Sequence, residues 1–131
     1  MGRILSCSKY FSGVVEGVIK MIEKDLKGEL SINDISSLSG YSEGHLRRMF
    51  KSVTGVSLAL YVRKNKLGNA ALDISMGRKA IDVAYEYGYS SQQSFCRAFK
   101  FTMGLPPSRY VSFLRNYAGK YSKPPRLVTM D

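Results

Sequence analysis

The stretch GYSEGHLRRMFK, residues 40–51, reappears as GYSSQQSFCRAFK, residues 88–100, with one residue added between the serine and the arginine. Landmark residues on both sides recur too, at an offset of 48 before the added residue and 49 after it. These pairs are Asp34/Asp82, Gly40/Gly88, Tyr41/Tyr89, Ser42/Ser90, Arg48/Arg97, Phe50/Phe99, Lys51/Lys100, Gly55/Gly104, Tyr61/Tyr110 and Val62/Val111. A period of this size normally corresponds to one supersecondary unit per copy, so we expect the same module twice.

Each copy carries the signals of two short helices separated by a turn. Ser31 and Asp34 form an acidic variant of the capping box, which predicts the start of a helix. The apolar stripe predicted for that helix is Ile32, Ile35 and Leu38. Gly40 can adopt the left-handed conformation that ends it, and Ser42 is placed to cap the next helix. In the second copy, Gly88 supplies the turn and Ser90 or Ser91 the cap. The short helix before that turn takes Ile81, Val83, Ala84 and Tyr85.

The helix after each turn divides into two faces at about 100° per residue. In the first copy the inward set is Leu46, Met49, Phe50 and Val53, and the outward set is Gly44, Arg48 and Lys51. In the second copy the inward set is Phe95, Ala98, Phe99 and Thr102, and the outward set is Gln93, Arg97 and Lys100. One copy alone fits a generic helical hairpin with a solvated outer face equally well. The recurrence favours a helix-turn-helix with a reading helix in each copy.

The remaining sequence predicts how the two modules are connected. We expect a loose lead-in over residues 1–9, a first helix-turn-helix subdomain over 10–56, a long linker helix over 57–77, a second subdomain over 78–119, and a loose basic tail over 120–131. A continuous linker helix is stiff and would hold the modules at a fixed separation. Pro106-Pro107 predicts the start of the last helix, because proline suits the first helical turn.

The net charge of +10 lies in and after the repeats. Residues 1–42 hold five Lys or Arg and five Asp or Glu, whereas residues 43–131 hold fifteen against five. Such a surface attracts a polyanion, above all nucleic acid. An anionic membrane is the competing partner, but the basic residues do not form one polybasic amphipathic helix. No apolar run of membrane-spanning length and no secretion signal is present, which predicts a soluble cytoplasmic protein, associated with the nucleoid when bound to DNA.

The sequence offers no constellation for catalysis or for a cofactor. Cys7 and Cys96 have no CxxC or Cys/His cluster around them, so neither a zinc site nor a structural disulfide is indicated. His45 is the only histidine, and no nucleophile pattern accompanies it. We therefore expect a protein that is not an enzyme and that binds no metal or cofactor.

Arginine pairs with guanine and glutamine with adenine through two hydrogen bonds each. The candidate base readers on this ground are Arg48, Arg97, Gln92 and Gln93. The candidate phosphate contacts are Lys51, Arg63, Lys64, Lys66, Lys100 and Arg109. Phosphate contacts position a protein on the duplex without giving it sequence specificity.

With these residues assembled, the chain resembles the DNA-binding region of the AraC/XylS family of bacterial transcription regulators, especially its short MarA/SoxS/Rob-type branch. The resemblance covers about residues 11–115. The stretches that carry it are GYS (40–42), HLRRMFK (45–51), TG (54–55), SQQSF (91–95), RAFK (97–100) and PPSRY (106–110).

The resemblance implies an all-α fold of seven helices, with two helix-turn-helix subdomains joined by a long linker helix. It also implies a monomer that binds an asymmetric promoter site on double-stranded DNA, activates transcription and recruits RNA polymerase. Carried over by position, the reading residues are Gly44, Arg47 and Arg48 in the first lobe and Gln92, Gln93, Ser94 and Arg97 in the second. The branch commonly has tryptophan at the position of Gly44 and glutamine at that of Arg47. This departure affects the specificity of the first lobe.

Other functions remain open on the sequence alone. A repressor or an accessory factor would use the same fold, and so would the DNA-binding domain of a larger ligand-responsive regulator. Too few residues lie outside the match to build a small-molecule ligand domain, and the initial Met favours a complete small regulator. A nonspecific packaging protein would need charge but not two matched reading helices. A DNA-repair methyl acceptor would rest on Cys96 alone.

Overall fold

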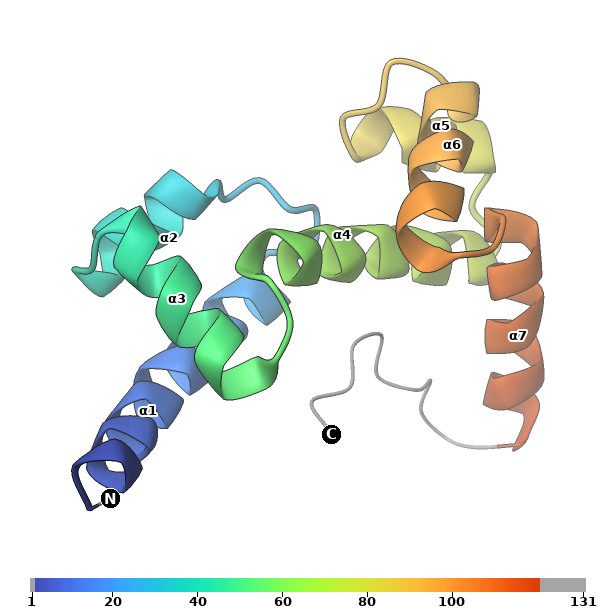
Figure 1. Ribbon diagram of the computed structural model, residues 1–131. Coiled ribbons are helices and arrows are strands. Elements are labelled where there is room, and N and C mark those ends of the chain that lie inside the picture. The colour runs from blue at the N-terminus through green and yellow to red at the C-terminus, as the bar shows by residue number, and fades with distance from the viewer. Residues whose placement is uncertain (1, 121–131) are drawn as a thin grey trace. The chain divides into compact units, whose positions relative to one another are not determined.

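The structure is a computed structural model that describes the backbone of residues 2–120 and the side chains of residues 11–117. Over this range the chain forms seven α-helices and no strand, which confirms the all-α expectation (Figure 1). The helices are α1 (Gly2–Lys24), α2 (Ile32–Ser39), α3 (Glu43–Thr54), α4 (Leu58–Ser75), α5 (Ala80–Glu86), α6 (Gln92–Met103) and α7 (Pro107–Lys120). The chain divides into two compact units between Val62 and Arg63, within α4.

The first unit packs α1, α2 and α3 against one another. The capping box is present at the start of α2, where the Ser31 hydroxyl accepts from the Asp34 amide at 3.0 Å and the Asp34 carboxylate accepts from the Ser31 amide at 2.9 Å. These bonds lower the pKa of Asp34. Ile35 is buried, but Leu38 is 65% exposed, so the predicted apolar stripe of α2 is wrong at that residue.

The two faces predicted for α3 are largely as expected. Leu46, Met49 and Phe50 are buried, whereas Val53 lies at the exposed edge of the helix. Ser42 caps the start of the helix, since its hydroxyl accepts from the His45 amide at 3.2 Å. Gly55, which has a positive φ of 76°, caps its C-terminal end.

The second unit has its own core, built by the C-terminal part of α4 with α5, α6 and α7. Its buried residues are Leu67, Ala70, Ala71, Val83, Ala84, Tyr87, Phe95, Phe99, Val111 and Leu114. Four rings follow one another through this core, with neighbouring centroids 5.3–5.9 Å apart: Tyr89, Phe95, Phe99 and Tyr110. The reading helix α6 is therefore held by aromatic contacts that run from the turn before it to α7.

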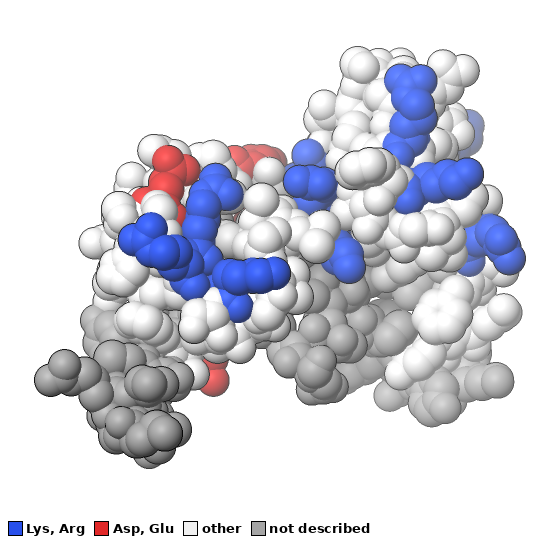
Figure 2. All heavy atoms as spheres, viewed as in Figure 1, with Lys and Arg blue, Asp and Glu red and all other residues white. Residues whose placement is uncertain are grey.

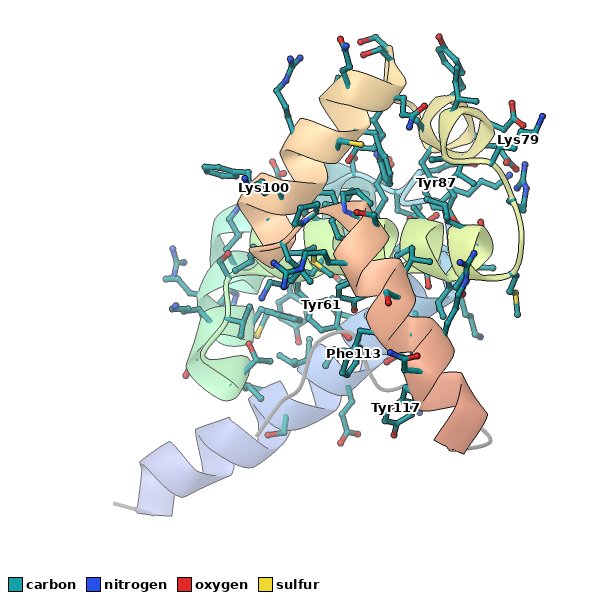
Figure 3. All side chains as sticks on the ribbon, turned by 90° about the vertical axis from the view of Figure 1, so that its right-hand side faces the viewer. Tyr61, Lys79, Tyr87, Lys100, Phe113 and Tyr117 are labelled. Atoms are coloured by element: carbon teal, nitrogen blue, oxygen red, sulfur yellow. The ribbon has the colours of Figure 1, made fainter. Side chains whose placement is uncertain are left out.

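A hydrogen bond joins the end of α5 to α4 in this second unit. The Tyr87 hydroxyl donates to a carboxylate oxygen of Asp73 at 2.7 Å, and the Tyr87 side chain is buried (Figure 3). Burial and then this bond raise the pKa of Tyr87 well above its usual range. The bond fixes the first helix of the second helix-turn-helix to the helix that precedes it.

Several helix limits test the sequence-based expectations. The predicted long helix is present as α4, and α7 begins at Pro107 as expected. In contrast, α1 begins at Gly2, where the sequence predicted a loose lead-in over residues 1–9. Proline, the strongest helix breaker, does not occur before Pro106. Residues 121–131, which make up most of the predicted basic tail, lie outside the described part of the chain.

Candidate nucleic-acid interface

The outer face of α3 carries a cluster of basic side chains. Arg47, Arg48 and Lys51 are all exposed, and Figure 2 shows Lys and Arg side chains gathered over this helix. The three line a shallow hollow of about 450 Å³ together with Ser52, Ser57 and Leu58. The Lys51 ammonium also donates to the Gly55 carbonyl at 3.0 Å, at the C-terminal end of the helix. The cluster thus presents three cations on one side of a helix whose other side is buried.

Gly44 leaves a gap in the first turn of this face. A Cβ atom placed there would meet a single neighbour within 4 Å, the Nη1 atom of Arg48 at 3.4 Å. The Arg48 guanidinium therefore lies over the surface that a side chain at position 44 would otherwise cover. Since the neighbour is the far end of a flexible side chain, the backbone of α3 does not exclude a larger residue here.

The second reading helix, α6, begins with a complete capping box. The Ser91 hydroxyl accepts from the Ser94 amide at 3.0 Å, and the Ser94 hydroxyl accepts from the Ser91 amide at 3.1 Å. The Ser94 hydroxyl also donates to the Ser91 carbonyl at 2.9 Å. Of the two serines predicted as caps, Ser91 is the one used. Ser94, a base-reading candidate by resemblance, is engaged in the cap, a role that the sequence analysis missed although the serine spacing contains it.

The outer face of α6 combines hydrogen-bonding and charged side chains. Gln92, Gln93 and Arg97 are exposed and line an open groove of about 810 Å³. The other residues that line this groove are Ile81, Tyr85, Ser91 and Cys96. Lys100 is also exposed and projects from α6 one turn further along (Figure 3). The structure thus brings Gln92, Gln93 and Arg97 together on one surface of the second unit.

The remaining phosphate candidates lie on α4 and α7 of the second unit. Arg63 and Arg109 are exposed, and Lys64 is partly buried. The Lys66 ammonium lies 4.9 Å from the centroid of the Tyr89 ring, a cation–π distance. Burial raises the pKa of Tyr89, and the charge of Arg63 opposes that shift. Lys66 therefore has a packing role in addition to its charge.

The described part of the chain also bears on other kinds of site. Residues there include no group of three or more His, Cys, Asp or Glu side chains that could hold a metal ion. His45 packs edge-on against the rings of Tyr41 and Phe11, at centroid distances of 5.3 and 6.0 Å. Among the described helices, none is long and apolar enough to cross a membrane.

Known proteins resemble this chain over most of its length. Residues 35–112 match the family described as "Helix-turn-helix domain". The chain is 35% identical over 104 residues to the HTH-type transcriptional activator AarP of Providencia stuartii, covering 79% of this chain and 77% of AarP. It is 38% identical over 97 residues to the multiple antibiotic resistance protein MarA of Salmonella typhimurium, covering 73% of this chain and 76% of MarA.

A solved structure shares the fold. The crystal structure of the DNA-binding domain of the global transcriptional factor AdpA, in complex with a target DNA, superposes with a TM-score of 0.62 at 16% identity. The superposition covers 82% of this chain and 97% of that one.

Proposed function

Because the chain belongs to the AraC/XylS family of DNA-binding transcription regulators, in its MarA/Rob-type branch, we propose that it is a transcriptional activator that binds an asymmetric promoter site as a monomer. The family consists of regulators and not of enzymes. The observation that carries the proposal is the matched pair of reading helices, in which Arg48 of α3 and Arg97 of α6 are both exposed at corresponding positions. AarP, which matches this chain over 104 residues, is named a transcriptional activator.

We assign base reading to the side chains that lie on the outer faces of α3 and α6. Gln92, Gln93 and Arg97 can form two-bond pairs with adenine and guanine in the major groove. Arg47 and Arg48 supply guanidinium groups on α3, where Gly44 adds no side chain. The side chains assigned to phosphates are Lys51, Arg63, Lys64, Lys66, Lys100 and Arg109. They contribute affinity that falls as salt rises.

The monomer proposal follows from having two reading helices in one chain. Dimeric helix-turn-helix proteins place two such helices in half-sites about one helical turn, roughly 34 Å, apart. We propose that the subdomains over residues 10–56 and 78–119 replace the two subunits of such a dimer. If B-DNA bends to admit both helices, the deformation costs about 1–6 kcal/mol.

Site selection from genomic fragments followed by sedimentation on a single duplex tests this proposal. We expect one asymmetric site and one protein molecule per duplex. Two molecules on a minimal site would contradict the monomer, and protection without sequence preference would indicate a packaging protein.

Transcription from a promoter with the selected site then tests recruitment of RNA polymerase. An activator raises transcript yield and retains polymerase on the promoter, whereas a repressor on the same fold lowers the yield while leaving the footprint intact. A fall in yield would replace the activator proposal with that alternative.

A further inference from the structure

Helix α5 exposes two large apolar side chains one helical turn apart. Ile81 is 45% exposed and Tyr85 is 57% exposed, although the neighbouring Val83 and Ala84 are fully buried. Residues four apart lie on the same side of a helix, so the two form a continuous apolar ridge. The helix is thus fixed to the core by one side and presents this ridge on another.

The ridge forms one side of the groove whose other side carries the proposed base readers. Ile81 and Tyr85 line the same space as Gln92, Gln93 and Arg97 of α6. Whatever fills this groove meets hydrogen-bonding groups and one positive charge on α6, and apolar surface on α5. The edge of a DNA base pair in the major groove matches this combination, because thymine presents an apolar methyl group beside the acceptors and donors of the bases.

Charges on α5 argue against a contact between this ridge and the phosphate backbone. Asp82, next to Ile81, is exposed and negatively charged. Glu86, next to Tyr85, is paired with Arg78. A carboxylate at Asp82 repels phosphate at close range, so the ridge suits the base edges better than the backbone.

The ridge is peculiar to the second unit. At the repeat offset of 48, the positions of Ile81 and Tyr85 correspond to Asn33 and Ser37 in α2, which are polar and exposed. The shared fold therefore does not require apolar residues at these positions. Their presence beside the groove of α6 points to a contact that only this unit makes.

We propose that Ile81 and Tyr85 contact the 5-methyl group of one or two thymines in the site read by α6, and so add a thymine preference to it. The inference rests on the proposed DNA-binding function. Burial of one methyl group corresponds to about a fourfold change in affinity.

Replacing thymines by deoxyuridine tests the proposal, because deoxyuridine keeps the base pair and removes only the methyl group. The full chain is titrated with duplexes in which each thymine of the selected site is replaced in turn. We expect one or two replacements to weaken wild-type binding about fourfold per methyl. The same replacements are expected to have little further effect on Ile81→Ala and Tyr85→Ala, whereas Tyr85→Phe retains the ring and the wild-type response.

Phe113→Ala is the matched control, since Phe113 is 55% exposed but lies on α7 and does not line the groove (Figure 3). This variant is expected to lose affinity on deoxyuridine replacement as much as the wild type does. Circular dichroism checks that each variant is folded. Selective binding with no response to deoxyuridine, or an equal response in wild type and variants, overturns the proposal alone. A Tyr85→Phe variant that weakens binding to all sequences alike also overturns it, in favour of a phosphate contact. If Ile81→Ala and Tyr85→Ala bind DNA normally but no longer support transcription, the proposal is overturned in favour of a ridge that binds a protein. If the wild-type protein selects no site, the proposed function fails as well.

Discussion

The two helix-turn-helix modules share a framework but hold and equip their reading helices differently. At the start of α3, Ser42 alone caps the helix, whereas α6 starts with the reciprocal pair Ser91 and Ser94. On the outer faces, Gly44 of the first module stands where the second has Gln93. The repeated features are those that the fold requires, such as the turn glycine and the buried aromatic. The features that differ lie where DNA would be read.

The modules also differ in how the short first helix is attached. In the second, Tyr87 at the end of α5 reaches α4 through its bond to Asp73. The corresponding residue of the first module is Ser39, whose hydroxyl donates to the Ser36 carbonyl within its own helix at 3.2 Å. The second module thus has a side-chain hydrogen bond between two helices where the first has a hydrogen bond within one helix. Because Gln92, Gln93 and Arg97 stand on the outer face of α6 whereas Gly44 adds no side chain to α3, we expect the second module to provide most of the sequence discrimination and the first to provide mainly affinity.

Substitution of the matched arginines tests this division most strongly. We expect Arg97→Ala to cost about 1–3 kcal/mol of binding free energy at the best site and to relax the preference at one base pair. Arg48→Ala should lower affinity with a smaller change in preference, because no glutamine accompanies Arg48 on α3. Binding-site selection with each variant measures both effects. Equal loss of preference in the two variants would contradict the division of roles.

Lys100→Ala supplies the contrast for a phosphate contact. This variant should weaken all sequences alike and reduce the slope of log affinity against log salt by about one unit. An altered sequence preference in Lys100→Ala would show that the lysine reads a base.

Removal of the Tyr87 hydroxyl tests the tie between helices. We expect Tyr87→Phe to lower the unfolding free energy by about 1 kcal/mol, because the ring still fills the core while the bond to Asp73 is lost. Ser39→Ala, which removes only the local bond of the first module, should cost less. Urea unfolding at neutral pH measures both changes, and an equal cost would mean that the tie adds nothing specific.

The same tyrosine makes stability depend on pH in the alkaline range. Because the folded state raises the pKa of Tyr87, its contribution is complete below the ordinary tyrosine pKa of about 10 and is lost as pH rises above that value. Burial shifts Tyr89 and Tyr110 in the same direction, so part of the dependence should remain in Tyr87→Phe. Unfolding curves across this pH range should show a shallower decline for the variant, and an unchanged decline would contradict the assignment.

Substitution of Gly44 tests the first module directly. Gly44→Ala should stabilise α3 by up to about 1 kcal/mol, since alanine is the better helix former. Gly44→Trp should tighten binding several-fold and sharpen the half-site of the first module, an effect that selection experiments measure. If Gly44→Trp abolishes binding to every sequence, the glycine serves a close approach between backbone and DNA.

The sequence predicted the elements whose signals are local. Capping at Ser31, the turn at Gly40 and the start of α7 at Pro107 depend on neighbouring residues, and all three were confirmed. Exposure of Leu38, Ile81 and Tyr85 was not predictable in this way. Helices of seven or eight residues bury only one or two side chains, and which side is covered depends on neighbouring helices. The capping role of Ser94 was not predicted, because a serine at the start of such a helix suits both a cap and a base contact.

The open space above Gly44 also bears on how this protein can change during evolution. A Cβ atom added there meets only the Nη1 atom of Arg48, at 3.4 Å and at the end of a flexible side chain, so a first side-chain atom fits without a shift of the α3 backbone. Most substitutions at reading positions of a well-fitted helix first remove an existing contact, but a substitution at this glycine begins by adding one. On the proposed reading faces, the first module is therefore where a single mutation can add a contact to DNA while the contact residues of the second module stay unchanged.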